Sequence, residues 1–201
     1  MRKEPQLILI CCEGKTEEQY FLMLRDIFRI SGGIKIQTVS NLGQHKTLVD
    51  ASAARRDEIF TEAGIFEAED DIEVWAVCDR DSYSDSYTKL RKYADSKSVN
   101  LAFSDPQFEN YLLQHFEGPN KSKNKGRELE QELASTMLEA RLGQAYLKGD
   151  LEWLRNMVDA KRSVVAHAAK NSNQFTTHTK QPFFTVQNLV TRLLSLTDYG
   201  K

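Results

Sequence analysis

The chain has 201 residues, 40% of them hydrophobic, which suits one domain of ordinary size or one domain with a helical appendage. No apolar run approaches the roughly 18 residues that cross a bilayer, and the apolar stretch near the N-terminus ends after Leu7–Cys12, which argues against a signal peptide. The net charge of −2 excludes a strong overall attraction to polyanions, and three cysteines without metal-ligand spacing favour a reducing cytoplasm over a disulfide framework.

The first part of the chain alternates strands and helices. Residues 7–12 form a continuous apolar run, typical of a strand buried on both faces. A helix follows, for which Thr16 and Gln19 supply a T-x-x-Q capping box. Residues 34–39 alternate as a strand does, and a second helix is expected from about residue 47 to residue 63.

The alternation continues with a strand at 72–78, a helix at 87–96 and a short strand at 99–103. The next helix is expected to have Ser104 or Asp105 as its cap and Pro106 in its first turn. This order predicts an α/β fold, a mainly parallel sheet flanked by helices on both faces.

Strand signals stop beyond residue 117. Helices are expected near 128–141, over 150–170 and from Thr185 onward. We therefore predict an α/β core over residues 1–117 and an α-helical C-terminal extension over residues 118–201 that packs on this core.

Charge is divided between the two parts of the chain. Residues 1–120 hold 14 Lys and Arg against 21 Asp and Glu, a balance of −7, whereas residues 121–201 hold 13 against 8, a balance of +5. Within the basic part, residues 121–127 carry four positive charges, which could contact a phosphate backbone or form a solvated loop.

The sequence ICCEGKTEEQ, residues 10–19, contains the Gly-Lys-Thr that ends a nucleotide-binding P-loop. A P-loop needs a second glycine five positions before Gly14, but that position is Leu9, inside the predicted strand. Only Glu13 separates the strand from Gly14, so the segment is too short to wrap a triphosphate.

Carboxylates follow two of the predicted strands instead. Glu13 is the first charged residue after one strand, and Asp79 and Asp81 follow another. Ligands of parallel α/β sheets bind at the carboxyl ends of the strands, where these hard oxygen donors would suit Mg²⁺. Each residue alone is more often a turn residue or a helix cap, so the hypothesis depends on their conjunction.

Four segments, EGKTEEQYF, VWAVCDRDSYSD, LAFSDPQFENYLLQHF and PFFTVQNLV, follow in order the pattern of the RloB-like family, which the chain resembles from Leu7 to about Leu196. These proteins occur beside restriction and phage-defence genes and are similar to the Toprim superfamily, whose domains form the metal-binding core of topoisomerases, primases and certain nucleases. The resemblance implies a cytoplasmic, Toprim-like enzyme.

Residue by residue, the resemblance assigns Glu13 as general acid/base or metal ligand, and Asp79 and Asp81 as ligands of Mg²⁺ or Mn²⁺. Many Toprim proteins have a third acidic residue where this chain has Tyr83, which makes Asp85 a substitute candidate. The family pattern adds Glu109, which could instead complement a helix dipole.

Lys15 and Arg80 lie next to these carboxylates in sequence, and His115 lies in the expected helix that contains Glu109. Lys15 could contact a scissile phosphate or remain a solvated lysine. Arg80 is expected to pair with a neighbouring carboxylate, and His115 to pack inside a helix. The three cysteines are expected to be small buried apolar residues.

The first functional hypothesis is a Mg²⁺-dependent nuclease that hydrolyses phosphodiester bonds of DNA or RNA in bacterial anti-phage defence. The alternative is a non-catalytic or partner-activated accessory subunit of a restriction or ATPase defence system. A phosphatase or nucleotidyl transferase using the same carboxylates is a third hypothesis. No membrane partner is expected, and the sequence leaves the oligomeric state, substrate specificity and number of metals open.

Overall fold

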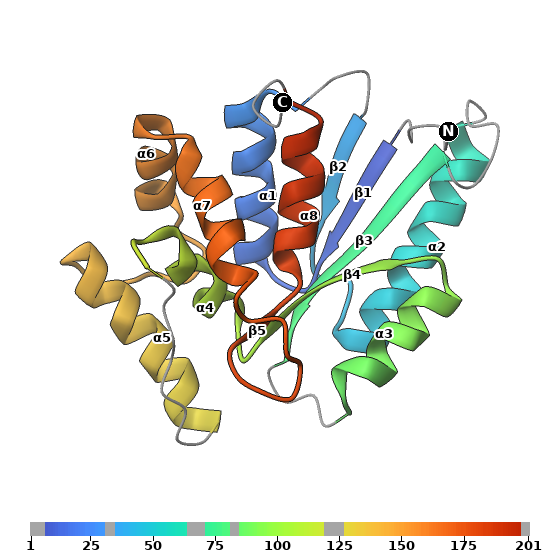
Figure 1. Ribbon diagram of the computed structural model, residues 1–201. Coiled ribbons are helices and arrows are strands. Elements are labelled where there is room, and N and C mark those ends of the chain that lie inside the picture. The colour runs from blue at the N-terminus through green and yellow to red at the C-terminus, as the bar shows by residue number, and fades with distance from the viewer. Residues whose placement is uncertain (1–6, 31–34, 64–70, 81–84, 119–126, 198–201) are drawn as a thin grey trace. The chain divides into compact units, whose positions relative to one another are not determined.

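A computed structural model describes residues 7–30, 35–63, 71–80, 85–118 and 127–197 (Figure 1). The chain divides into two compact units. Unit 1 contains Met1–Cys78, Ser84–Leu101 and Ser195–Lys201, and unit 2 contains Asp79–Tyr83 and Ala102–Leu194. Segments of the two units therefore alternate along the chain.

The described elements follow in this order: β1 (Leu7–Cys12), α1 (Lys15–Phe28), β2 (Lys35–Val39), α2 (His45–Ala63), β3 (Ile72–Asp79), α3 (Tyr87–Ser96), β4 (Asn100–Asp105), α4 (Phe108–Leu112), the 3₁₀ helix η2 (Leu113–His115), α5 (Arg127–Leu142), α6 (Glu152–Ala160), α7 (Ser163–Ser172), β5 (Phe183–Phe184) and α8 (Val186–Ser195). The strands form one sheet in the order β2-β1-β3-β4-β5. β1 pairs in parallel with β2 and β3, whereas β4 and β5 are antiparallel. The predicted α/β class, a mostly parallel sheet flanked by helices, is confirmed.

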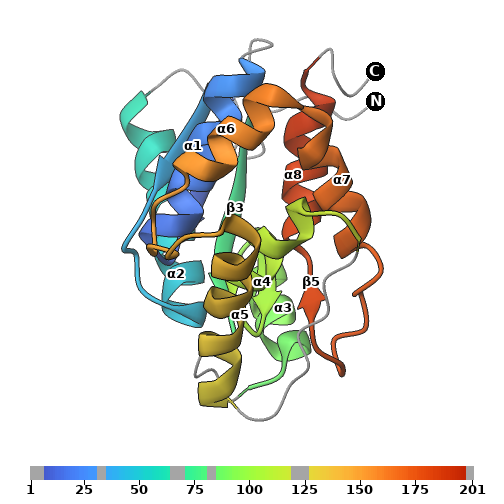
Figure 2. The same cartoon turned by 90° about the vertical axis from the view of Figure 1, so that its left-hand side faces the viewer.

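Strand β1 is the central strand of unit 1. All six of its residues are buried, and the register places Leu7 opposite Ile72 and Cys12 opposite Val77 of β3. Helix α1 covers one face of these strands and α2 and α3 cover the other (Figures 1 and 2). This follows from right-handed crossovers, because the chain moves from β1 outward to β2 and then back across β1 to β3.

Helix α1 begins differently from the prediction. Gly14, not Thr16, is the N-cap residue, and its extended backbone has no side-chain capping bond. The reason is that pairing continues past β1, since the Glu13 N–H donates to the Val77 carbonyl at 2.9 Å. The helix therefore starts at once with Lys15, and Thr16 lies inside it with 2% of its surface exposed.

Strand β4 is longer than predicted. Ser104 and Asp105 do not cap a helix, because they extend the strand and pair with Phe184 and Phe183 of β5. Helix α4 begins only at Phe108, with Gln107 as its N-cap. Pro106 lies between the strand and this helix rather than in the first turn.

Two further features of the C-terminal part were missed. The two-residue strand β5 lies in a segment that was expected to be a loop. The single helix expected over residues 150–170 is two helices, α6 and α7, interrupted at Lys161, whose backbone is extended. No glycine or proline marks this interruption; α6 and α7 pack against each other, each with its own set of buried residues.

Aromatic side chains make up much of the core of unit 2. The ring of Tyr111 contacts those of Phe184 and His115, with centroids 5.9 and 5.7 Å apart, and Phe184 also contacts Phe175. Phe108, Tyr111 and Leu112 are no more than 1% exposed. Across the described part of the chain, none of the helices combines the length and apolar character that a membrane span needs.

Candidate functional site

The carboxyl ends of β1 and β3 lie at one edge of the sheet. In the parallel register, Cys12 is opposite Val77, Glu13 follows β1 directly, and Asp79 is the last residue of β3. The backbone hydrogen bond from Glu13 to Val77 fixes the turn at which Glu13 leaves the strand. One carboxylate oxygen of Glu13, Oε2, is buried.

A second carboxylate lies close to this turn. Glu17, in the first turn of α1, is only 6% exposed. A Cβ atom added to Gly14 would lie 2.9 Å from Oε2 of Glu17, so the carboxylate folds back over the Gly14 backbone. A larger residue at position 14 would therefore have to shift the end of the Glu17 side chain, and the backbone angle of Gly14 itself is not unusual. Glu17 is the fifth residue of the segment EGKTEEQYF that carries the RloB-like resemblance, although it was not among the predicted site residues.

Lys15 lies at the surface of the same turn. Its side chain is 69% exposed, and its Nζ is 3.8 Å from a carboxylate oxygen of Glu18. Glu18 also accepts a hydrogen bond from the Ser40 hydroxyl at 2.9 Å. A lysine this exposed can contact a phosphate group. The same exposure is expected of a solvated lysine without a function.

Asp79 and Arg80 belong to unit 2. Asp79 is buried, with 8% of its surface exposed. The Arg80 backbone N–H donates to the Ser104 carbonyl at 2.8 Å, and its Nη1 lies 2.7 Å from Oδ2 of Asp105. The prediction was that Arg80 pairs with a neighbouring carboxylate, and the partner that the structure shows, Asp105, comes from β4.

Asp81, the third predicted ligand, lies outside the described residues, as do Lys121, Lys123 and Lys125 of the basic segment. Among the residues that the structure does describe, no group of three or more His, Cys, Asp or Glu side chains is arranged to hold a metal ion. The predicted three-carboxylate set thus remains a prediction, since one of its members is not described.

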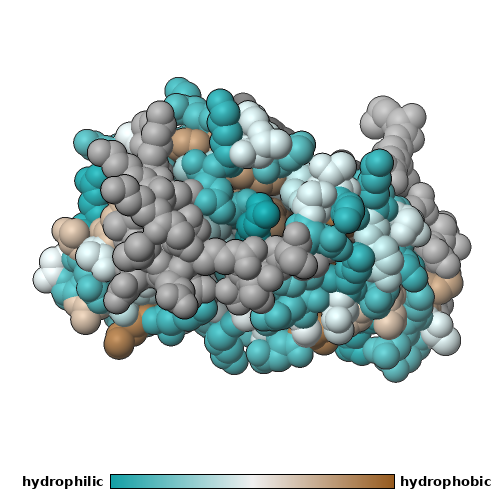
Figure 3. Space-filling view, turned by 90° about the horizontal axis from the view of Figure 1, so that it is seen from below, coloured by the Kyte–Doolittle hydropathy of each residue, from teal (hydrophilic) through white to brown (hydrophobic). Residues whose placement is uncertain are grey.

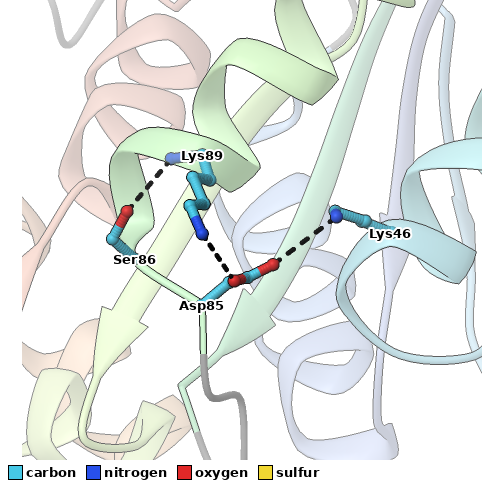
Figure 4. A network of polar contacts seen from close by, with 4 residues as sticks. All are labelled: Lys46, Asp85, Ser86 and Lys89. Carbon is cyan, nitrogen blue, oxygen red and sulfur yellow. Dashed lines mark hydrogen bonds and ion pairs between the residues drawn. The ribbon is translucent and has the colours of Figure 1, made fainter.

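Asp85 is engaged by lysines. Its two oxygens lie 3.1 Å from Nζ of Lys89 and 3.5 Å from Nζ of Lys46, and the neighbouring Ser86 caps α3 (Figure 4). The hydrogen bond and charge of Lys89 lower the pKa of the Asp85 carboxyl below its ordinary value. This ion-pair network ties the start of α3 to the start of α2 and offers Asp85 a structural role in place of metal binding.

Glu109 is buried at the start of α4. It is 3% exposed, and its Oε1 accepts a hydrogen bond from the Tyr146 hydroxyl at 3.2 Å. The residue therefore has a structural partner within unit 2, in addition to its favourable position at a helix N-terminus.

The expectations for histidine and cysteine are confirmed. His115 is 3% exposed, and its Nδ1 donates to the Leu112 carbonyl at 3.0 Å. Burial lowers the pKa of His115 to about 4, so it is neutral at physiological pH. Cys11, Cys12 and Cys78 are free thiols no more than 1% exposed.

The face toward which the carboxyl ends of β1 and β3 point is drawn in Figure 3. Its coloured residues are mostly hydrophilic, and the hydrophobic ones are small and scattered. Such a surface suits a polar or charged ligand better than an apolar one.

A family model described as RloB-like protein matches residues 8–193. The chain belongs to the RloB-like family. No curated protein and no solved structure matches it. The RloB-like match spans all the candidate residues, from Glu13 and Lys15 through Asp79, Asp81 and Asp85 to Glu109.

Proposed function

We propose that this RloB-like protein is a Mg²⁺-dependent Toprim-type nuclease that hydrolyses phosphodiester bonds of DNA or RNA in anti-phage defence. The observation that carries the proposal is the placement of carboxylates after two adjacent parallel strands. Glu13 follows β1 and Asp79 ends β3, at the edge where α/β proteins bind their ligands.

The donors present suit a hard divalent cation. Carboxylate oxygens are what Mg²⁺ prefers, and both residues are at least partly removed from water, where a nearby cation favours the charged form of a carboxylate. Glu13 and Asp79 would hold the ion, with Asp81 as a further ligand. When bound, Mg²⁺ would position and polarise a phosphate group and lower the pKa of water.

The remaining chemistry belongs to the chain. Glu13 would accept a proton from the attacking water, or donate one to the leaving oxygen. The backbone hydrogen bond from Glu13 to Val77 would hold the turn that carries this carboxylate in place. Exposed Lys15, two residues further along, would contact the non-bridging phosphate oxygens of the substrate.

The test is an endonuclease assay of the full chain with plasmid, single-stranded DNA and tRNA in Mg²⁺ or Mn²⁺. Asp79→Asn should reduce cleavage by at least about 100-fold while the far-ultraviolet circular dichroism stays unchanged, because the substitution removes a charged donor with little change in volume. Asp95→Asn, on an exposed ion pair of α3, is the matched control and should cleave as the wild type does.

Each assay is repeated with the products of the genes that adjoin the gene for this protein. Cleavage only in their presence would identify a partner-activated nuclease. If no substrate is cut under either condition, or if Asp79→Asn loses activity only by unfolding, the catalytic proposal is wrong and the accessory-subunit alternative stands.

A further inference from the structure

Asp105 is a buried carboxylate to which the proposed reaction gives no role. It ends β4, and only 1% of its surface is exposed. Its Oδ2 lies 2.7 Å from Nη1 of Arg80, and its Oδ1 accepts a hydrogen bond from the Gln181 side chain. A buried charge is costly unless it is paired and hydrogen-bonded, and here both oxygens have partners.

Asp105 and its two partners come from three distant parts of the chain, all within unit 2. Arg80 directly follows β3, Asp105 ends β4, and Gln181 precedes β5. β4 and β5 are paired in register, with Asp105 opposite Phe183, which brings Gln181 near Asp105. The pairing of β4 with β5 and the hydrogen bond from Gln181 thus hold the Asp105 carboxylate independently of Arg80.

Arg80 is fixed twice. Its backbone N–H donates to the Ser104 carbonyl at 2.8 Å, and its guanidinium is bound by Asp105. Successive side chains of an extended segment point to opposite sides. Holding Arg80 on one side therefore directs the side chain of Asp79, the preceding residue, toward the other.

The Arg80–Asp105 pair also determines which carboxylate the Arg80 guanidinium contacts. Arg80 is a cation directly after Asp79, and its side chain is 29% exposed. Without Asp105, the guanidinium would be free to turn toward the Asp79 carboxylate and compete with a divalent ion for it. Asp105 gives the guanidinium another anionic partner.

We propose that Asp105 and Arg80, braced by Gln181, are positioning residues that orient Asp79 and keep its carboxylate available to a divalent cation. This inference rests on the proposed function, because it assumes that Asp79 is a metal ligand. It adds Asp105, Arg80 and Gln181 to the site, none of which was among the predicted site residues.

Isothermal titration calorimetry of Mn²⁺ into the full-length protein tests the inference without an activity assay. Asp105→Asn, which removes the charge but keeps the shape, should weaken Mn²⁺ binding by roughly 10-fold or more, as loss of a partner behind a metal ligand does. Asp95→Asn, which breaks the exposed Arg91–Asp95 pair of 2.8 Å, is the control and should leave the Mn²⁺ affinity unchanged.

The double variant Arg80→Gln/Asp105→Asn separates positioning from general stability. It removes the guanidinium that competes for Asp79 and leaves two amides able to hydrogen-bond each other. The double variant should therefore bind Mn²⁺ more tightly than Asp105→Asn. Arg80→Lys, on the partly exposed side of the pair, serves where Asp105→Asn does not fold, and should also weaken binding because the lysine ammonium does not reproduce the position of the guanidinium Nη1 that contacts Asp105.

The outcomes distinguish the two proposals. If Asp79→Asn weakens Mn²⁺ binding while Asp105→Asn and Arg80→Lys bind as the wild type does, the positioning role is wrong and the metal site stands. Equal weakening in Asp105→Asn and the double variant would also overturn it, since that pattern reflects general loss of structure. If Asp79→Asn itself binds Mn²⁺ normally, the proposed function fails, and the inference with it.

Discussion

Gly14 and Glu17 determine the shape of the turn that presents Glu13. The Gly14 backbone is extended, with φ of −126°, which any residue can adopt. The close neighbour of a larger residue would be the carboxylate of Glu17, 2.9 Å from where a Cβ atom would lie. The turn is therefore specified by a contact between residues three apart and not by backbone strain.

This contact predicts the effect of Gly14→Ala. The added methyl group must shift the end of the Glu17 side chain, so we expect a loss of about 1 kcal/mol or less in the free energy of unfolding, measured by urea denaturation. In a Glu17→Ala background the same substitution should cost much less, because the obstructing oxygen is gone. An equal cost in both backgrounds would show that the contact is not the cause.

At the same scale, prediction from the sequence was reliable only where one residue's chemistry was decisive. The pairing of Arg80, the burial of His115 and the burial of the cysteines were all predicted. A charge removed from water needs a partner, and a free cysteine behaves as a small hydrophobic residue. Asp105 and Glu17 were missed as buried acids, since burial of a carboxylate depends on partners, such as Gln181, that are distant in sequence.

Among the elements, strands β4 and β5 depend on one threonine. The Thr185 N–H donates to the Phe103 carbonyl at 2.8 Å, and its hydroxyl accepts from the Phe103 N–H at 2.9 Å. Thr185 therefore connects the two strands through its backbone and its side chain at once.

Thr185→Val should consequently lower the free energy of unfolding by about 1–3 kcal/mol, because it removes the acceptor of a buried N–H while preserving side-chain volume. Urea denaturation followed by circular dichroism measures the change. Thr185→Ser keeps the hydroxyl and is expected to cost clearly less. Similar losses in both variants would point to the missing methyl group instead of the hydrogen bond.

The 3₁₀ helix η2 carries a pH-dependent contribution to stability through His115. Burial lowers its pKa in the folded protein to about 4, whereas its ordinary value is 6.5. As pH falls below 6.5 the unfolded chain takes up a proton that the folded protein does not, so stability is present above 6.5 and is lost between 6.5 and 4.

Between pH 7 and pH 5 this term should remove about 2 kcal/mol of unfolding free energy. The measurement is the difference between wild type and His115→Asn in urea denaturation at each pH. Asparagine can still donate to the Leu112 carbonyl but does not titrate, so the variant should show the smaller decrease. Parallel pH profiles would contradict this assignment.

Most element boundaries could be predicted from local pattern, and the exceptions have tertiary causes. Helix α3 was predicted at its observed bounds, and the structure shows Ser86 capping it and Leu90 and Ala94, four residues apart, buried. Strand β5 could not be predicted, since two residues form a strand only when β4 is beside them. For the same reason Ser104 and Asp105 were predicted as helix caps, since their pairing with β5 does not show in the local sequence.

Across the whole chain, the three cysteines report on the integrity of unit 1. Burial raises the pKa of Cys11 to about 11 and that of Cys12 well above its ordinary value, so their thiols are protonated as well as inaccessible. Cys78 is buried in the same unit.

A thiol reagent such as Ellman's reagent should therefore react with the native protein at least on the order of 100-fold more slowly than with the protein in denaturant, where all three thiols become available. Absorbance at neutral pH gives both the rate and the number of thiols. A rapid stoichiometric reaction of any cysteine in the native protein would show that unit 1 opens far more readily than its packing implies.

The alternation of segments between the two units also bears on how this protein can vary. A gene fragment that stops after residue 117 would encode β4 without β5, leaving Ser104 and Asp105 with no strand to pair with and Arg80 with a carboxylate that Gln181 no longer braces. Neither unit corresponds to one uninterrupted stretch of gene. Recombination is therefore expected to transmit the two units together, and lineages should gain or lose them as a single module.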